Sequence, residues 1–225
     1  MIKNRNLVVQ INHKIMKKIL LTFAFVIVMT ISASAQFKPF QFGLKVEPGI
    51  GWSKLNSDHL YDGSSKMNFS WGFVGNVFFV ENYGISTGFN VRFMNNEYKF
   101  DNQIHGEITR IIKNQYLEIP VGLTMRTEKI GDIRITGNVG YGFGFFLNNK
   151  ERNYKANGDE ITMTTKYNNI RHALIVKLGI EYYIHQSSCI TTSLVFNNNF
   201  ANIYAKDYQQ NVLLNSLSLE IGFMF

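Results

Sequence analysis

The sequence predicts an all-β protein, an eight-stranded antiparallel up-and-down transmembrane β-barrel. Apolar and polar residues alternate in eight segments, as they do in strands whose two faces meet unlike surroundings. The connections between these segments are long and short by turns, which is typical of transmembrane barrels. The polar faces are also rich in glycine, which suits the crowded interior of a narrow closed barrel better than a surface in water.

The first four expected strands cover residues 40–52, 67–80, 83–94 and 115–126. In the first, Phe, Leu, Val, Ile and Trp alternate with Gln, Gly, Lys and Glu. The second and third set aromatic and aliphatic residues against Asn, Ser and Gly. The fourth alternates aliphatic residues with Tyr, Glu, Gly, Thr and Arg, and it contains Pro120. Because proline cannot donate to a ladder, we expect a bulge or a missing hydrogen bond there.

The other four expected strands cover residues 133–145, 170–184, 189–198 and 211–225. The fifth has glycine at alternate positions over much of its length, and the sixth and seventh alternate less cleanly. The last sets Leu, Ile and Phe against Ser, Glu and Gly, and the chain stops at Phe225. This ending resembles the closing strand of bacterial outer-membrane β-barrels. The resemblance implies that the barrel-insertion machinery reads the last strand and its terminal Phe225.

The connections test the strand assignment independently. The long ones are residues 53–66, 95–114, 146–169 and 199–210, and the short ones are residues 81–82, 127–132 and 185–188. Such barrels have short periplasmic turns and longer extracellular loops, so both ends of the barrel should lie on the periplasmic side. Asn157-Gly158-Asp159 predicts a hairpin turn at the tip of the longest loop.

A soluble barrel of the lipocalin type is the alternative, because it also alternates but buries its apolar face. The polar face decides against it, since a surface in water would favour Lys, Glu and Thr over glycine. We therefore expect Phe42, Phe73, Val121 and Leu219 to face lipid, and Gly142 and Arg92 to face the lumen.

The polar face also carries charges, which must be paired if they are enclosed. We expect Arg92 to face Glu118, Lys45 to face Glu220, and Arg134 to face Glu181 across neighbouring strands. A barrel of about eight strands is just wide enough for its side chains to fill, so a structural plug is expected rather than a diffusion pore. The charged residues expected to line the lumen and to pair there are Lys45, Glu47, Arg92, Glu118, Arg126, Arg134, Lys177, Glu181 and Glu220.

The amino terminus predicts a cleaved secretory signal peptide over residues 1–35, with the barrel domain over residues 36–225. Met16 begins a short cationic segment and is a possible true start, residues 19–31 are apolar, and Ala33-Ser34-Ala35 is a cleavage site. The apolar run is shorter than the ~20 residues of a spanning helix. Residues 1–35 hold five of the 23 basic residues and no acid, so the remaining 18 basic and 16 acidic residues leave a net charge of +2. Nucleic acid is therefore not an expected partner.

The sequence gives little support for a catalytic or metal-binding site. His59 and His105 fall in expected extracellular loops and His185 in a periplasmic turn. His172 lies on the apolar face near the outer rim, but no Ser partner is close on that strand, so we expect an interfacial aromatic role. Cys189 is the single cysteine and is expected to be a small buried side chain. No metal-ligand spacing occurs, and we expect no cofactor, no metal and no catalytic residue.

Tyr116-Leu117-Glu118-Ile119-Pro120 is the most distinctive segment. Together with residues 137–142, residues 178–182 and the ending on Phe225, it resembles the PorT-like outer-membrane β-barrel family over essentially the whole mature chain. The resemblance implies an eight-stranded barrel in the outer membrane of a Gram-negative bacterium. It brings no catalytic motif, and the family's namesake is linked to protein export by the type IX system.

The expected function is therefore a non-enzymatic outer-membrane barrel with a filled lumen. Its partners would be outer-membrane lipid and a surface ligand or envelope protein, bound by the extracellular loops, above all residues 146–169. One alternative is an accessory of type IX secretion, which rests on the resemblance alone. A second alternative is a lipid A-modifying enzyme that uses His172.

Overall fold

The computed structural model describes residues 39–55, 60–163, 165–205 and 211–225. The expected signal peptide and His59 lie outside the described residues. The described residues form no helix long and apolar enough to cross a membrane. Their strands are β1 Phe40–Leu55, β2 Leu60–Asp62, β3 Lys66–Val80, β4 Tyr83–Asn102, β5 Gly106–Arg126, β6 Ile133–Lys155, β7 Glu160–Ile161, β8 Ile170–Tyr183, β9 Cys189–Asn199 and β10 Val212–Met224.

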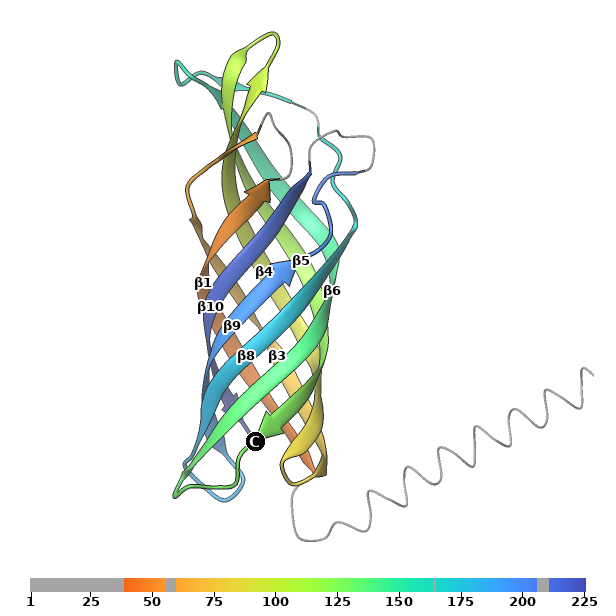
Figure 1. Cartoon of the computed structure of the whole chain (residues 1–225), viewed down its shortest axis with the longest axis vertical. Coiled ribbons are helices and arrows are strands. Elements are labelled where there is room, and N and C mark those ends of the chain that lie inside the picture. Colours follow the sequence, from red (N-terminus) through yellow and green to blue (C-terminus); the bar gives the residue numbers. More distant parts are fainter. Residues whose placement is uncertain (1–38, 56–59, 164, 206–210) are drawn as a thin grey trace, which may run out of the picture. The chain divides into compact units, whose positions relative to one another are not determined.

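Eight of these strands close into an antiparallel barrel, which confirms the predicted fold (Figure 1). The order around the barrel is β1, β3, β4, β5, β6, β8, β9 and β10, and β10 pairs with β1 to complete it. The two short strands lie outside this circle, with β2 paired to β4 and β7 paired to β6. We call the end where β1 begins and β10 stops the lower end, and the opposite end the upper end.

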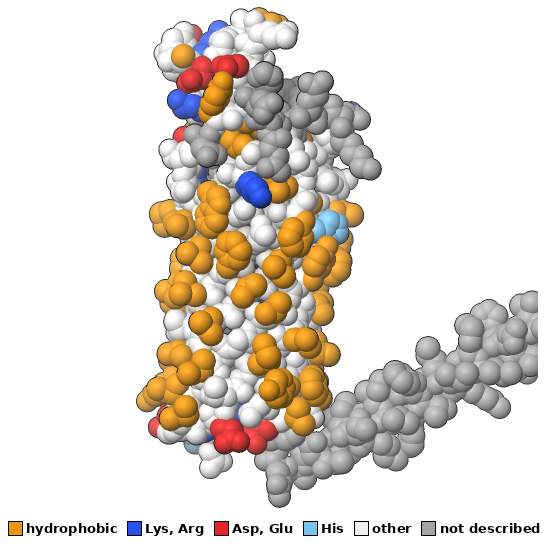
Figure 2. Space-filling model, viewed as in Figure 1, with side chains coloured by type: hydrophobic (Ala, Val, Ile, Leu, Met, Phe, Trp, Pro, Cys, Tyr) orange, Lys and Arg blue, Asp and Glu red, His pale blue; other side chains and the backbone are white. Residues whose placement is uncertain are grey.

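The outer wall is apolar and the interior is polar, which excludes a soluble barrel with an apolar interior. Phe42, Phe73, Val121 and Leu219 are 43–52% exposed, whereas Arg92 is 3% exposed. Gly142 is buried as well. Figure 2 shows hydrophobic side chains spread over the visible wall, with charged side chains gathered toward its two ends. A wall of this kind is stable only where lipid replaces water around the barrel.

Three strands run further upward than the sequence predicted. The expected loop of residues 95–114 is the continuation of β4 and β5, which pair without a break from Asn90 with Glu118 up to Asn102 with Gly106. The expected loop of residues 146–169 is likewise the continuation of β6, its turn and β7. The turn at Asn157-Gly158-Asp159 is present, and Gly158 has the positive φ that a tight hairpin needs.

Pro120 interrupts the ladder between β4 and β5 without a bulge. The pairing runs from Thr87 with Val121 to Asn90 with Glu118, and Ile119 and Pro120 have no registered partner on β4. The register is the same on both sides of this gap, so of the two expected outcomes the structure shows the missing pairing. The irregularity of β5 lies higher, against β6, where Gln115 pairs with Asn148 and Tyr116 with Phe146.

Candidate functional site

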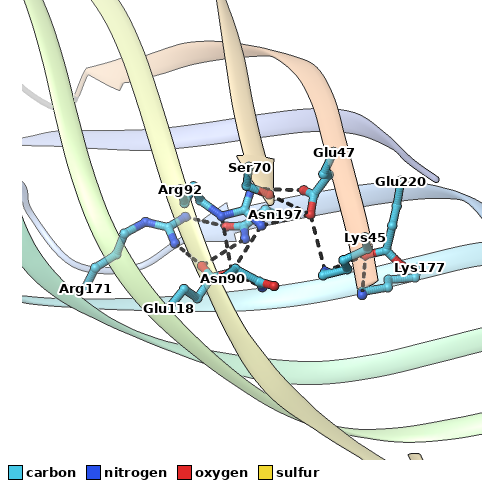
Figure 3. Close-up of polar contacts among 10 residues, drawn as sticks. All are labelled: Lys45, Glu47, Ser70, Asn90, Arg92, Glu118, Arg171, Lys177, Asn197 and Glu220. Carbon is cyan, nitrogen blue, oxygen red and sulfur yellow. Dashed lines mark hydrogen bonds and ion pairs between the residues drawn. The ribbon is translucent and has the colours of Figure 1, made fainter. Parts of the chain in front are cut away.

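The middle of the lumen is built around Glu118 of β5, a carboxylate that is fully buried. Arg92 of β4 contacts one of its oxygens, with 3.1 Å from Nη2 to Oε1. Arg171 of β8 contacts the other oxygen, and Asn197 of β9 donates to it at 3.4 Å. Figure 3 shows these side chains converging from separate strands. Through its two oxygens, Glu118 of β5 therefore links β4, β8 and β9.

Arg92 extends this contact to β1. Its Nη1 donates to Glu47 Oε1 at 3.0 Å and its Nη2 to Glu47 Oε2 at 3.2 Å. Ser70 of β3 donates to the same carboxylate at 3.1 Å, and Lys45 Nζ lies 3.5 Å from it. Because charge-assisted, two-pronged hydrogen bonds are the strong ones, Arg92 and Glu47 fix each other's position in the lumen.

Below this level, two lysines share Glu220 of β10. Lys45 Nζ of β1 lies 2.5 Å and Lys177 Nζ of β8 lies 2.7 Å from Glu220 Oε2 (Figure 3). The expected facing pairs of Lys45 with Glu220 and of Arg92 with Glu118 are thus both formed. We use the name lumen network for Lys45, Glu47, Arg92, Glu118, Arg171, Lys177, Asn197 and Glu220.

Glycines of β6 make the room that these charges need. A Cβ added to Gly144 would stand 3.0 Å from Cβ of Arg171, and one added to Gly142 would stand 3.3 Å from the carboxyl carbon of Glu118. Both distances are too short for ordinary packing. The glycines on the inner face of β6 therefore leave the space that the Arg171 and Glu118 side chains occupy.

At the lower end the expected pair of Arg134 and Glu181 does not form. The two residues are registered partners on β6 and β8, but Arg134 Nη2 lies 2.8 Å from Glu81, in the turn between β3 and β4. Glu181 instead accepts a hydrogen bond from Tyr183 at 2.8 Å and lies 3.9 Å from Arg126. Register brings the backbones together, but the long arginine side chain reaches past its neighbour to a carboxylate at the rim.

A small cavity of about 50 Å³ lies in the lower half of the lumen. Its lining includes Asn76, Ser86, Thr124 and Asn138, with Lys177 at one side. A polar cavity of this size has room for a few water molecules. Above it the lumen network closes the barrel, since Glu47, Arg92 and Glu118 are 1%, 3% and 0% exposed.

Above the lumen network, the barrel encloses an apolar cluster that we call the upper core. Its charged member is Arg110 of β5, which lies 3.1 Å from Glu151 of β6 and donates to the hydroxyls of Tyr98 and Tyr204 at 3.3 Å. The two tyrosine hydroxyls also bond to each other. The buried apolar members of the upper core are Leu60, Met94, Tyr98, Phe100, Ile108, Ile112, Tyr116, Ile203, Tyr204, Val212 and Leu214.

Glu151 joins the segment between β7 and β8 to this upper core. It accepts hydrogen bonds from Tyr167 and, at 3.1 Å, from Thr165. The Tyr167 ring stacks on Phe146, with 5.7 Å between ring centroids. Burial and the hydrogen bond to the Glu151 carboxylate raise the pKa of Tyr167 above its ordinary value. These contacts hold the segment against the upper part of the barrel.

Arg171, Arg110 and Glu151 are not among the residues that the sequence places in the lumen. Arg171 lies six residues before Lys177, so strict alternation along β8 would have placed both in the lumen. Arg110 was assigned to a loop. Glu151 follows the irregularity at Leu147, where β6 gains one residue relative to β5 and its faces exchange. Alternation counted from the lower end of β6 places Glu151 on the outer wall, so it predicts the wrong face for this residue.

His172 lies on the outer wall beside Tyr141 and Phe143, with ring centroids 5.8 and 6.1 Å away. Cys189 is buried at the lower end of the lumen. Among the residues that the structure describes, no group of three or more His, Cys, Asp or Glu side chains could hold a metal ion.

A family model described as "Outer membrane protein beta-barrel domain" matches residues 32–205. The solved structure of Ail of Yersinia pestis in complex with the heparin analogue sucrose octasulfate is 14% identical, with 84% of this chain and 100% of that chain covered and a TM-score of 0.41. OprG of Pseudomonas aeruginosa is 10% identical, with 83% and 95% covered and a TM-score of 0.49. With TM-scores below 0.5, these similarities do not bear on function. No curated protein matches the chain.

Proposed function

This chain belongs to the outer membrane protein beta-barrel domain family and lies in the outer membrane of a Gram-negative bacterium, and from that premise we propose that it is a non-enzymatic, non-conducting barrel that acts through its upper part at the cell surface. The observation that carries the proposal is the filled lumen. Glu47, Arg92 and Glu118 are almost completely buried and hydrogen-bonded across the barrel. A solute could pass only if these ion pairs separated, which would leave buried charges unpaired.

The upper part supports a binding role because it is a folded platform. β4, β5 and β6 continue above the apolar wall, and their inner faces pack around the upper core. The hairpin of β4 and β5 projects furthest in Figure 1, and the hairpin of β6 and β7 stands beside it. The β6–β7 turn is held by hydrogen bonds between Lys155, Gly158 and Asp159. A surface built on paired strands presents its side chains in a fixed arrangement, which favours recognition of a partner.

Conductance of the purified full-length chain in planar lipid bilayers tests the closed lumen. We expect no discrete channel openings above those of the lipid alone. Regular openings by the unmodified chain would contradict a non-conducting role. The experiment is independent of any ligand, so it can be done before a partner is known.

The role of the upper part is tested by shortening the hairpin of β6 and β7. Asn153 and Ile161 are registered partners, so residues 154–160 can be replaced by an Asn-Gly turn that keeps Glu151 and the upper core. We expect the variant to insert and to keep heat-modifiable migration on gels, but to fail to restore the phenotype of a strain that lacks the gene. A matched control replaces residues 103–105 between β4 and β5 by Asn-Gly. The control should restore the phenotype. Full complementation by the variant that lacks residues 154–160 would contradict binding through the hairpin of β6 and β7.

A role as an accessory of type IX secretion, with PorT-like membership, is the second candidate. Its basis is the segment Tyr116-Leu117-Glu118-Ile119-Pro120, in which Tyr116 packs in the upper core and Glu118 centres the lumen network. Packing therefore accounts for these two residue types without any partner. Normal secretion of cargo proteins by a strain that lacks the gene would eliminate this candidate.

A lipid A-modifying activity is the least favoured candidate, because His172 packs against Tyr141 and Phe143 on the outer wall. These contacts suit an aromatic side chain at the membrane boundary. We expect unchanged lipid A in a strain that overproduces the chain, and a change that depends on His172 would contradict the non-enzymatic proposal.

A further inference from the structure

A groove of about 380 Å³ lies on the outer wall where the apolar surface gives way to a polar one. Asn95 of β4, Lys113 of β5 and Lys150 of β6 stand side by side there as registered partners. Gln115 and Asn148 form the pair directly below the two lysines. The groove is thus a cationic and amide-rich site crossed by three strands.

The two lysines form an unusual pair. Lys113 and Lys150 lie directly opposite each other, an arrangement in which like charges destabilise a sheet. Neither forms an ion pair with a carboxylate of the described residues. Neighbouring cations do have acidic partners, as in Lys66 with Glu97 at 2.7 Å, Lys99 with Glu107 at 3.0 Å and Arg152 with Glu160 at 3.9 Å. An anion from outside the chain would remove the repulsion between Lys113 and Lys150.

The position of the groove indicates what kind of anion. Immediately below it the wall is apolar, with Leu117 paired to Phe145 and with Leu147, which is 51% exposed. The lysines therefore lie at the level of the lipid headgroups, with their ammonium groups on long stems that can follow the boundary. A ligand that reaches both surfaces has a charged head and apolar chains.

We propose that this groove binds the phosphate of a lipopolysaccharide-type glycolipid in the outer leaflet. Lys113 and Lys150 make charge-assisted hydrogen bonds to the phosphate, and Gln115 and Asn148 offer amide groups to the sugar. The acyl chains lie below, against Phe145 and Leu147. The site goes beyond the proposed binding at the upper surface and shares with it only the premise that the upper end faces outward.

The test is binding of rough lipopolysaccharide to the purified full-length chain in detergent. We expect Lys113→Gln/Lys150→Gln to weaken the apparent affinity by roughly tenfold or more, from the loss of two cations near a charged lipid surface. Lys54→Gln/Lys166→Gln is the matched control, because it removes two exposed lysines of the upper part that lie outside the groove. Lys113→Arg/Lys150→Arg should restore binding. Heat-modifiable migration checks that each variant is folded.

Further arms separate the possible sources of the phosphate. We expect lipid A without its phosphates to bind roughly tenfold more weakly than intact lipid A, and millimolar inorganic phosphate to compete poorly against lipopolysaccharide. Equal affinity of the groove variant and the wild-type chain would overturn the proposal, as would equal binding of phosphorylated and dephosphorylated lipid A. Inorganic phosphate that bound as tightly as the glycolipid would also overturn it. None of these results depends on the phenotype of the shortened hairpin.

Discussion

The lower and upper parts of this barrel are built from the same strands but have opposite interiors. In the lower part, β4 turns Ile85 and Phe89 toward lipid and Asn90 and Arg92 toward the lumen. In the upper part, the same strand buries Met94, Tyr98 and Phe100 and turns the half-buried polar residues Asn95, Glu97 and Lys99 outward. The change occurs within a few residues of Phe93, although the backbone continues without a break in its pairing to β5.

The difference shows that the surroundings, and not the fold, decide which face of a strand is apolar. Lipid accepts apolar side chains on the outside, so the lower lumen must pair its own charges. Water surrounds the upper part, so the hydrophobic effect draws apolar side chains inward as in a soluble protein. The groove at Lys113 and Lys150 lies where these two arrangements meet.

The largest effect that separates the two parts is expected from removing a buried charge. Glu118→Ala leaves Arg171 without its carboxylate partner and Arg92 with Glu47 alone, which should cost about 3–5 kcal/mol of unfolding free energy. The control is Glu107→Ala, whose ion pair with Lys99 is exposed and worth about 1 kcal/mol or less. Urea unfolding of chains refolded in lipid measures both. Equal losses would mean that the lumen network does not hold the lower part together.

A charge placed on the outer wall should have the next largest effect. Val121→Lys puts an ammonium group near the middle of the lipid-facing wall, at a cost of about 2–4 kcal/mol. Ile111→Lys is the same kind of change on the same strand, but its neighbour on β4 is Glu97 and its surroundings are water, so we expect less than about 1 kcal/mol. The same unfolding measurement compares them. A similar cost at both positions would place the upper part in lipid.

Much of the lower part was predictable because alternation, turn lengths and strand pairing depend on local pattern alone. The lower ends of the strands, the lipid-facing residues and the pairs Arg92 with Glu118 and Lys45 with Glu220 follow from it. The partner of Arg134 did not, because a long side chain can reach a carboxylate that its register does not indicate.

The upper part was missed for two different reasons. Met94, Tyr98 and Phe100 do alternate with polar residues, but in the opposite phase, so a search for apolar residues on the lipid side ended at Met94. Alternation could not predict that Glu151 faces inward, because the extra residue at Leu147 exchanges the faces of β6. The apolar residues of upper β4 could therefore have been predicted from their alternation. The position of Glu151 could not, because alternation does not reveal a backbone irregularity.

The smallest expected effect concerns the attachment of the upper part alone. Tyr167→Phe removes the hydrogen bond to Glu151 but keeps the stacking on Phe146, so we expect a local loss of about 0.5–1.5 kcal/mol and an unchanged lower part. Limited proteolysis between β7 and β8 measures it, with heat-modifiable migration as the control for the barrel.

The pH dependence of the same variant sharpens this comparison. Because the pKa of Tyr167 is raised in the folded state, its contribution is complete below about pH 10, the ordinary tyrosine value, and is lost as the pH rises above it. Proteolysis of the wild-type segment should therefore accelerate above about pH 10. Tyr167→Phe should show a weaker acceleration, since Tyr98 and Tyr204 of the upper core remain. An identical pH profile in both chains would show that the hydroxyl of Tyr167 does not hold the segment to the upper core.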